Sequence, residues 1–266
     1  MRDLAVYLKL MVSAVRAKME YRFTFLFMFL AIVVFYLGQL GVVIVALARF
    51  TNINGWNAGE MAFLYGLLVF SQGVATALFA PLANFESLII SGDFDRYLVR
   101  PLNPLAQVVT GSFEINSVAH LMIGSAALYY GSRLAGLEWN LGRLLFFAAV
   151  MAGAALIHGG VRLAVSAVAF WTLRNRSLVH MIVYSSKEFV IYPVSIYKMW
   201  IQVFLTVVFP IAFINFYPSH YFLAKDPSAL FHPYLQYLTP LAGLVVFALA
   251  HMLWKKGIDQ YQSAGS

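Results

Sequence analysis

The sequence predicts an all-α integral membrane protein with six transmembrane helices, an N-terminal amphipathic interfacial helix and one short cytoplasmic helix. Three observations predict this class: the composition, six long apolar segments and a one-sided distribution of lysine and arginine. Of the 266 residues, 62% are hydrophobic and 11% are charged, and the mean hydropathy is +0.78. Soluble domains are about 45–50% apolar and about 25% charged. A soluble globule is therefore excluded, because its surface needs more charge than this chain supplies.

Six segments have the length and apolar character that a helix needs to cross the hydrocarbon, about 20 residues. They are Phe23–Leu47, Met61–Phe79, Val108–Tyr130, Leu144–Trp171, Met199–Tyr217 and Tyr237–Trp254. No low-complexity tract, flexible linker or internal repeat divides the chain. We therefore predict a single transmembrane domain, residues 1–266.

Lysine and arginine gather on one side of these predicted spans. Thirteen of the 18 lie there, Lys187 and Lys198 among them, while four lie on the other side and Arg162 lies inside a span. Basic loops face the cytoplasm, so both termini are predicted to be cytoplasmic. The net charge of +7 is thereby largely explained, and no nucleic-acid partner is predicted. Together with the absence of cysteine, this distribution favours a multi-pass protein of the bacterial cytoplasmic (inner) membrane.

An amphipathic helix is predicted before the first span, over residues 1–21. Its polar side chains are spaced by seven, four, three and four residues, which places them on one stripe of a helix. They are Arg2, Lys9, Ser13, Arg16 and Glu20. Because basic amphipathic helices lie in the headgroup layer, we expect this one at the cytoplasmic surface. The alternative is a plain extension of the first span.

Three connections are longer than simple turns. They are residues 81–104 and 172–198 on the cytoplasmic side and residues 218–236 on the external side. We expect residues 91–101 to form a helix of about two turns, which Pro101 ends. The second connection is expected to lie along the cytoplasmic surface up to Pro193, or to enter the membrane only partly. The external connection is aromatic and is expected to pack at the interface.

Ionisable side chains inside predicted spans are candidates for a functional site, because they are costly in hydrocarbon and usually pair or face a cavity. Counting about 1.5 Å per residue, Glu114 and Arg162 lie about 10 and about 13 Å from the cytoplasmic ends of their spans, which allows an ion pair. His120 and His158 share a depth of about 20 Å. Two interpretations stay open for these four residues: a clamp between helices, or the polar lining of a transport route.

Catalytic and nucleotide-binding motifs are missing from the sequence. There is no Gly-Lys pair, and hence no P-loop for ATP, and there is no H-E-x-x-H metal motif. Gly-Ser pairs at 111–112 and 124–125 are weak signals of a serine nucleophile, and small residues in a span more often mark close helix packing. We therefore predict that the chain is not an enzyme, with no catalytic residue, no metal and no cofactor of its own.

Two stretches carry a resemblance to a known family. Residues 91–102 read SGDFDRYLVRPL, which is similar to a Gly-x-hydrophobic-Asp-x-x-Leu-x-Arg-Pro pattern. Residues 192–197 and 209–218 read YPVSIY and FPIAFINFYP. With six spans after an amphipathic helix, the chain resembles the permease, or membrane-spanning subunit, of the type-2 ATP-binding-cassette exporter superfamily, in its branch of uncharacterised permeases.

The resemblance implies a complex with cytoplasmic ATPase subunits and with a second permease, identical or a sister chain, in the lipid bilayer. ATP and Mg would be bound by the ATPase, and residues 91–101 would be the coupling helix that contacts it. The ATPase-coupling residues so implied are Gly92, Asp93, Phe94, Asp95, Arg96, Tyr97, Leu98, Arg100 and Pro101. Phe94, Tyr97 and Leu98 would be the apolar anchor. A loop from Arg174 to Glu188 would add a second contact.

The predicted function is therefore that of an ATP-driven exporter subunit that moves an amphipathic or lipophilic substrate, drug-like or lipid-like, out of the cytoplasm. Two alternatives stay open. One is a proton-coupled secondary transporter that uses Glu114 and the intramembrane histidines. The other is a membrane assembly protein without transport activity.

Overall fold

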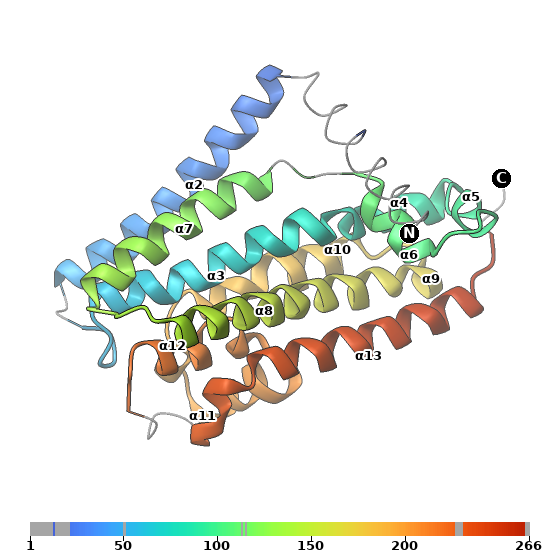
Figure 1. Ribbon diagram of the computed structural model, residues 1–266. Helices are drawn as coiled ribbons and strands as arrows, with labels where there is room; N and C mark the ends of the chain where they lie inside the picture. The colour runs from blue at the N-terminus through green and yellow to red at the C-terminus, as the bar shows by residue number, and fades with distance from the viewer. Residues whose placement is uncertain are drawn as a thin grey trace.

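The computed structural model describes residues 13, 22–49, 52–112, 114, 116–226 and 231–263. The predicted interfacial helix, residues 1–21, lies outside the described residues except for Ser13. Five long helices form a bundle (Figure 1). They are α2 (Arg22–Arg49), α3 (Ala58–Phe79), α7 (Asn116–Leu134), α8 (Leu141–Ala167) and α13 (Thr239–Asp259). Every regular element in the described part of the chain is helical, as the sequence predicts.

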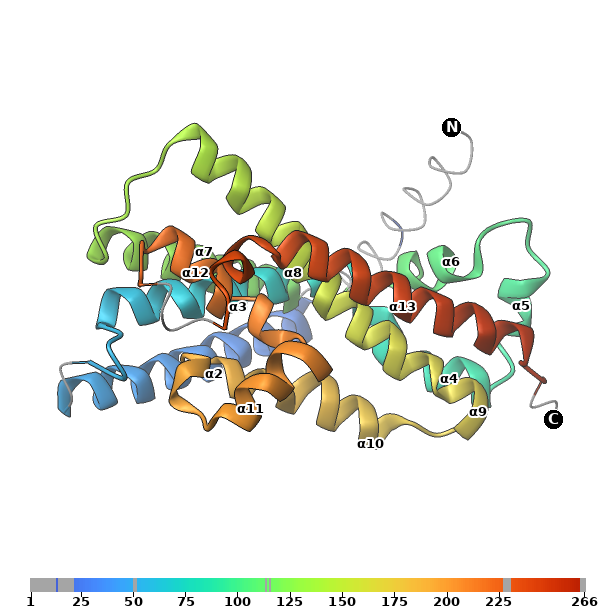
Figure 2. The same cartoon turned by 90° about the horizontal axis from the view of Figure 1, so that it is seen from below.

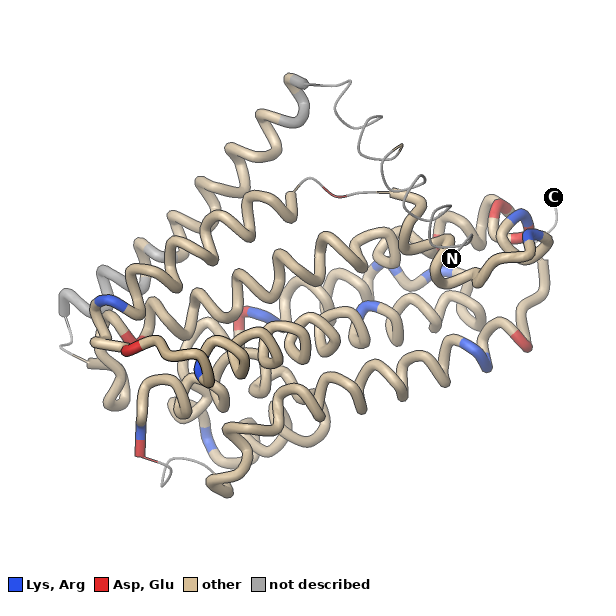
Figure 3. Tube along the Cα trace, viewed as in Figure 1, with Lys and Arg blue, Asp and Glu red and all other residues tan. Residues whose placement is uncertain are grey.

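The bundle has two ends, and charged residues gather toward them (Figure 3). The α5 end carries η1 (Ala80–Asn84), α4 (Phe85–Ile90), α5 (Asp95–Leu98), α6 (Pro104–Thr110), α9 (Ala169–Thr172) and α10 (Arg176–Leu178). The α12 end carries the loop 52–57, η4 (Val194–Ile196), α12 (Phe216–Phe222) and η8 (Pro233–Tyr237). The predicted external loop 218–236 therefore begins inside α12.

Glycines let α3 and α7 approach closely. A Cβ added at Gly124 would lie 2.5 Å from the backbone nitrogen of Phe70, and one at Gly131 would collide with the backbone of Phe63. Gly124 and Gly131 are seven residues apart, so they lie on one face of α7. The packing interpretation of the small residues at 124–125 is thus confirmed for Gly124. Small residues at such contacts replace the hydrophobic driving force that is missing between helices in lipid.

The start of α3 is fixed by a capping box and an ion pair. The Asn57 side chain accepts from the Glu60 backbone N–H at 3.0 Å, and Glu60 accepts from the Asn57 backbone N–H at 2.9 Å. The Glu60 carboxylate also pairs with Lys225 at 2.8 Å, whose ammonium lies 4.5 Å from the Trp56 ring. These contacts tie the loop after α12 to the first turn of α3.

The third predicted span, Val108–Tyr130, is not one helix. It is divided into α6 (Pro104–Thr110) and α7 (Asn116–Leu134). Glu114 therefore lies in the break between two helices and not within a continuous span. The cap at Gly111, whose N–H bonds Val108 O at 3.3 Å, ends α6.

The surface course expected for residues 178–193 is wrong. Near its start, the backbone N–H groups of Asn175 and Arg176 donate to Glu86 at the α5 end, at 2.6 and 2.5 Å. Just after its end, Ser195 accepts from Asn54 in the loop at the α12 end, at 3.0 Å. The 176–192 segment, made of α10, η2 (Val179–Ser185) and η3 (Ser186–Val190), therefore runs lengthwise along the bundle between these two contacts, and its later part lies beside α2 (Figure 2).

The expected fifth span, Met199–Tyr217, is also wrong as a straight helix. Met199–Val208 and Ile211–Phe222 form a pair bent by 83°. Pro210 lacks an N–H and disfavours helical backbone at Phe209, whose φ and ψ are −128° and 82°. Because Ser195 and α12 both lie at the α12 end, residues 199–222 enter the bundle and return to the same end (Figure 2). We call residues 199–222 the hairpin.

Buried side chains hold the hairpin. Thr206 and Tyr217 join its two limbs through their hydroxyl oxygens, 2.6 Å apart. Asn215, fully buried, donates its amide to Leu64 O at 3.3 Å and to Val190 O at 2.6 Å. The hairpin is thus bonded to α3 and to the 176–192 segment, which satisfies polar groups that lipid cannot.

Three helical segments of the described chain are long and apolar enough to cross a membrane: Ala58–Ile90, Leu141–Thr172 and Thr239–Asp259. The bent hairpin pair passes the same criterion as a unit, which makes four. The protein is therefore a multi-pass membrane protein.

The Gly131→Ala substitution is expected to destabilise the protein by about 1–3 kcal/mol, because the added methyl overpacks the α3–α7 contact. The unfolding temperature of the purified protein in detergent measures it. Gly38→Ala is the matched control, since a Cβ at Gly38 has nothing within 4 Å and alanine favours the helix. An unchanged unfolding temperature for Gly131→Ala would contradict the close packing.

The Asn215→Leu substitution is expected to loosen the hairpin, since Leu64 O and Val190 O lose a donor at a cost of about 1–3 kcal/mol. The measurement is the rate of limited proteolysis within residues 199–222, which should rise. Asn52→Ala, which removes an exposed amide at the α12 end, should leave that rate unchanged. Equal rates for both variants would show that Asn215 does not hold the hairpin.

Candidate functional site

A polar cavity of about 200 Å³ lies inside the bundle, toward the α5 end. Residues from α3, η1, the break before α7, α7, α8 and the 176–192 segment line it. They are Gln72, Thr76, Ala80, Ala83, Asn84, Glu114, Asn116, His120, Arg162, Tyr184 and Lys187. The structure therefore brings Glu114, His120 and Arg162, three of the four predicted intramembrane residues, to one place.

Arg162 forms the inner wall of the cavity. Its side chain is 4% exposed, and its guanidinium donates to Ala75 O at 3.1 Å and to Thr76 Oγ1 at 3.0 Å. Arg162 thus clamps α8 to α3, which supports the clamp interpretation without excluding the route. The ion pair with Glu114 stays a prediction, because the hydrogen bonds described for Arg162 all go to α3.

The sequence counts Lys187 among the residues of a cytoplasmic connection, whereas the structure places its side chain at a cavity inside the bundle. Its ammonium lies 5.4 Å from the ring centroids of Phe35 and Tyr36 on α2, and the side chain lines the cavity. Hydropathy missed it because the polar residues 185–188 interrupt the apolar run. The signal that was available is Pro193, which ends the 176–192 segment six residues before the hairpin begins at Met199.

The two histidines have different surroundings. His120 Nδ1 is 2.5 Å from Asn116 O, and its ring is 5.1 Å from that of Tyr36. His158 Nε2 is 3.5 Å from Ser71 Oγ. His158 lies in a second, smaller cavity that shares Arg162 and Lys187 with the first and ends at the hairpin bend. A line of polar groups therefore leads from the α5 end to the hairpin.

The predicted coupling segment lies at the α5 end, but its helix has one turn, α5 (Asp95–Leu98). The anchor role expected for Phe94 is wrong, because Phe94 is 0% exposed. Its ring packs 5.1 Å from Phe85, 5.5 Å from Phe170 and 6.2 Å from Trp254. Local amphipathicity showed that one face is apolar, but the chain's own core takes that face.

The exposed part of the segment is a tip of four residues, Arg96, Leu98, Val99 and Arg100. Leu98 is 38% and Val99 is 83% exposed. The sequence pattern did not single out Val99, whose isolated exposure only the fold reveals. Tyr97 is half-buried and lies under the Arg100 guanidinium, 6.0 Å from ring to Cζ.

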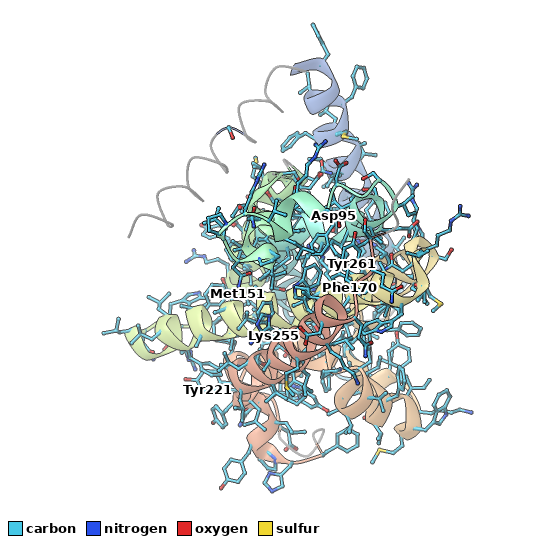
Figure 4. All side chains as sticks on the ribbon, turned by 90° about the vertical axis from the view of Figure 1, so that its right-hand side faces the viewer. Asp95, Met151, Phe170, Tyr221, Lys255 and Tyr261 are labelled. Carbon is cyan, nitrogen blue, oxygen red and sulfur yellow. The ribbon has the colours of Figure 1, made fainter. Side chains whose placement is uncertain are left out.

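The acidic residues of the segment bond within the chain. Asp95 accepts from Tyr261 Oη at 2.9 Å and from Ser263 Oγ at 2.6 Å, and Figure 4 shows Asp95, Tyr261 and Phe170 together at the α5 end. Burial and the bond to Asp95 raise the pKa of the Tyr261 phenol. Asp93 accepts from Ser91 Oγ at 2.8 Å and pairs with Arg96 at 3.3 Å.

Two further residues shape the turn. Gly92 has a φ of +71°, a backbone conformation that favours glycine. Pro101 follows the tip. The side-chain amide of Gln107 then fixes the chain on both sides of residues 98–100, because it donates to Tyr97 O at 2.9 Å and to Leu102 O at 3.1 Å.

The second contact expected over residues 174–188 is wrong for its far half. Residues 174–176 lie at the α5 end through Glu86. Glu188 instead accepts from Gln39 Nε2 on α2, at 3.1 and 3.3 Å. No group of three or more His, Cys, Asp or Glu side chains in the described ranges is arranged to hold a metal ion.

Comparison with known proteins places this geometry in a family. No curated protein and no solved structure matches the chain. A family model described as an ABC-2 family transporter protein matches residues 24–265. This match covers all the long helices, the tip and the hairpin, and it confirms the resemblance. The chain belongs to the ABC-2 transporter family, as a type-2 ATP-binding-cassette permease subunit.

Proposed function

We propose that this chain is the membrane-spanning subunit of an ATP-driven exporter in the bacterial inner membrane. It pairs with an identical or sister permease on two cytoplasmic ATPase subunits, which bind ATP and Mg. The family match supports the transport role. The chain itself contributes the path and the contact with the ATPase, and it is not an enzyme.

The exporter that we propose crosses the membrane six times, and the course of the chain supports this count. The crossings are α2, α3, α6 with α7, α8, the 176–192 segment and α13. The hairpin enters from the α12 end and returns. The basic tip supports a cytoplasmic position for the α5 end, and six crossings then leave both termini on the cytoplasmic side.

The observation that carries the coupling role is the exposed tip at the α5 end. Leu98 and Val99 are apolar and exposed, while Phe94, buried four residues before Leu98, fixes the turn. A few apolar side chains supply most of the energy of a protein contact, and charges at its rim set its register. Arg96 and Arg100 provide that rim, so the tip fits a groove on an ATPase.

The cargo that best fits the structure is amphipathic or lipophilic, drug-like or lipid-like. An apolar groove of about 630 Å³ lies between α8, α13 and the hairpin. Val161, Ile182 and Phe209 line both this groove and the second, smaller cavity, which Arg162 and Lys187 also line. An amphipathic molecule could place its apolar part in the groove and its polar part beside the polar side chains on the other side of these three residues.

Simultaneous replacement of Leu98, Val99 and Arg100 by Ala is expected to weaken binding of the ATPase subunit at least about tenfold, since hot-spot side chains contribute about 2 kcal/mol or more. Co-purification of the ATPase with the tagged permease measures it. Replacing the exposed Lys255 and Lys256 by Ala serves as the control. Undiminished recovery of the ATPase with the triple variant would contradict the coupling role.

A second candidate function is proton-coupled transport, which the shared position of Glu114 and His120 in one cavity favours. If the chain is an exporter subunit, proteoliposomes that contain the permease without its ATPase should not move a lipophilic substrate under a pH gradient. Transport under those conditions that disappears in Glu114→Gln would instead establish the proton-coupled mechanism.

A further inference from the structure

The geometry points to the polar cavity as a binding site for an oxyanion, a phosphate or carboxylate group carried by the cargo. Naming the charge of the cargo rests on the proposed transport function. The site itself is a property of the folded permease, so binding can be measured without the ATPase.

The charges that line the cavity are unbalanced. Arg162 and Lys187 are cations, and Glu114 is the carboxylate among the lining residues. Glu188, the next residue after Lys187, is not among the residues that line the cavity, and its carboxylate accepts from Gln39 on α2. Among the described residues that line the cavity, one positive charge is therefore in excess, at a depth where such a charge is costly. An anionic group would neutralise it.

The donors that such a group needs are present and oriented. Two N–H groups of Arg162 are used by Ala75 and Thr76, and a guanidinium has five, so others remain. The Lys187 ammonium has two aromatic rings 5.4 Å away. Within the described part of the chain it has no carboxylate or other acceptor at bonding distance. A fixed guanidinium beside such an ammonium is a strong site for an oxyanion.

The size and position of the cavity also fit. A volume of about 200 Å³ holds several water molecules or one small oxyanion. Asn84 and Glu114 place its outer part at the α5 end, which the proposal makes cytoplasmic. The anion has two sources, the headgroup of an amphiphile or a free soluble anion. The apolar groove nearby favours the amphiphile.

The test uses the full-length permease in phosphatidylcholine nanodiscs. Inorganic phosphate, dodecyl phosphate and dodecylphosphocholine, whose headgroup also carries a cation, are titrated, and the dissociation constant is measured by calorimetry. We expect saturable binding of dodecyl phosphate, at least about tenfold tighter than dodecylphosphocholine. Lys187→Gln should lose at least about tenfold in affinity, while Lys187→Arg and the exposed control Lys255→Gln should keep it.

Each outcome of this titration either supports or overturns the proposed oxyanion site. Binding of dodecyl phosphate alone identifies an amphiphile headgroup, and equal binding of inorganic phosphate identifies a soluble anion; both support the site. Should Lys187→Gln fail to fold, competition between the three compounds on the wild-type protein still tests the preference for an anion. The inference is overturned if neither inorganic phosphate nor dodecyl phosphate binds more tightly than dodecylphosphocholine. It is also overturned if Lys187→Gln binds dodecyl phosphate as tightly as the wild-type protein does. The exporter proposal is judged separately, by loss of the ATPase from the tip variant.

Discussion

The buried bond between Arg162 and the end of α3 is the interaction on which the interior of this protein depends. Its guanidinium bonds Ala75 O and Thr76 Oγ1, which fixes α8 against α3 where both helices approach the α5 end. A cation in hydrocarbon is tolerated only where protein or water surrounds it. Its presence therefore requires the polar surroundings that the break at Glu114 and the 176–192 segment supply, and the cavity is the result.

Irregular backbone in this protein occurs where the chain itself can satisfy it. The break between α6 and α7 lines the cavity, and the bend at Pro210 lies against the bundle interior. Lipid offers no hydrogen bonds to exposed N–H and C=O groups, so non-helical segments at membrane depth must be buried in protein or line a cavity. Asn215 shows how: its amide replaces bonds that the hairpin cannot make to itself.

Much of the fold could be predicted from hydropathy, because the sequences of α2, α3, α8 and α13 are long, mostly apolar runs. The 176–192 segment could not, because polar residues such as Lys187 interrupt it and find partners only in the folded bundle. The same limit applies to the site. Glu114, His120 and Arg162 stood out as charges within apolar runs, whereas Lys187 did not. Phe94 was misassigned because the pattern of one turn cannot tell whether its apolar face meets a partner or the chain's own core.

The tip and the cavity are joined by a short series of bonds. Glu86, on α4 just before the tip, accepts from the backbone of Asn175 at 2.6 Å. The Asn175 amide donates to Val165 O on α8 at 2.6 Å, and Arg162 lies three residues earlier on that helix. If the tip binds the ATPase as proposed, a displacement of the tip would move α4, and it would then either stretch these bonds or move α8 against α3. Because the Arg162 clamp is part of the cavity wall, the second outcome changes the cavity. In the exporter that we propose, contact of the ATPase with the tip would in this way change the cavity that we propose as a binding site.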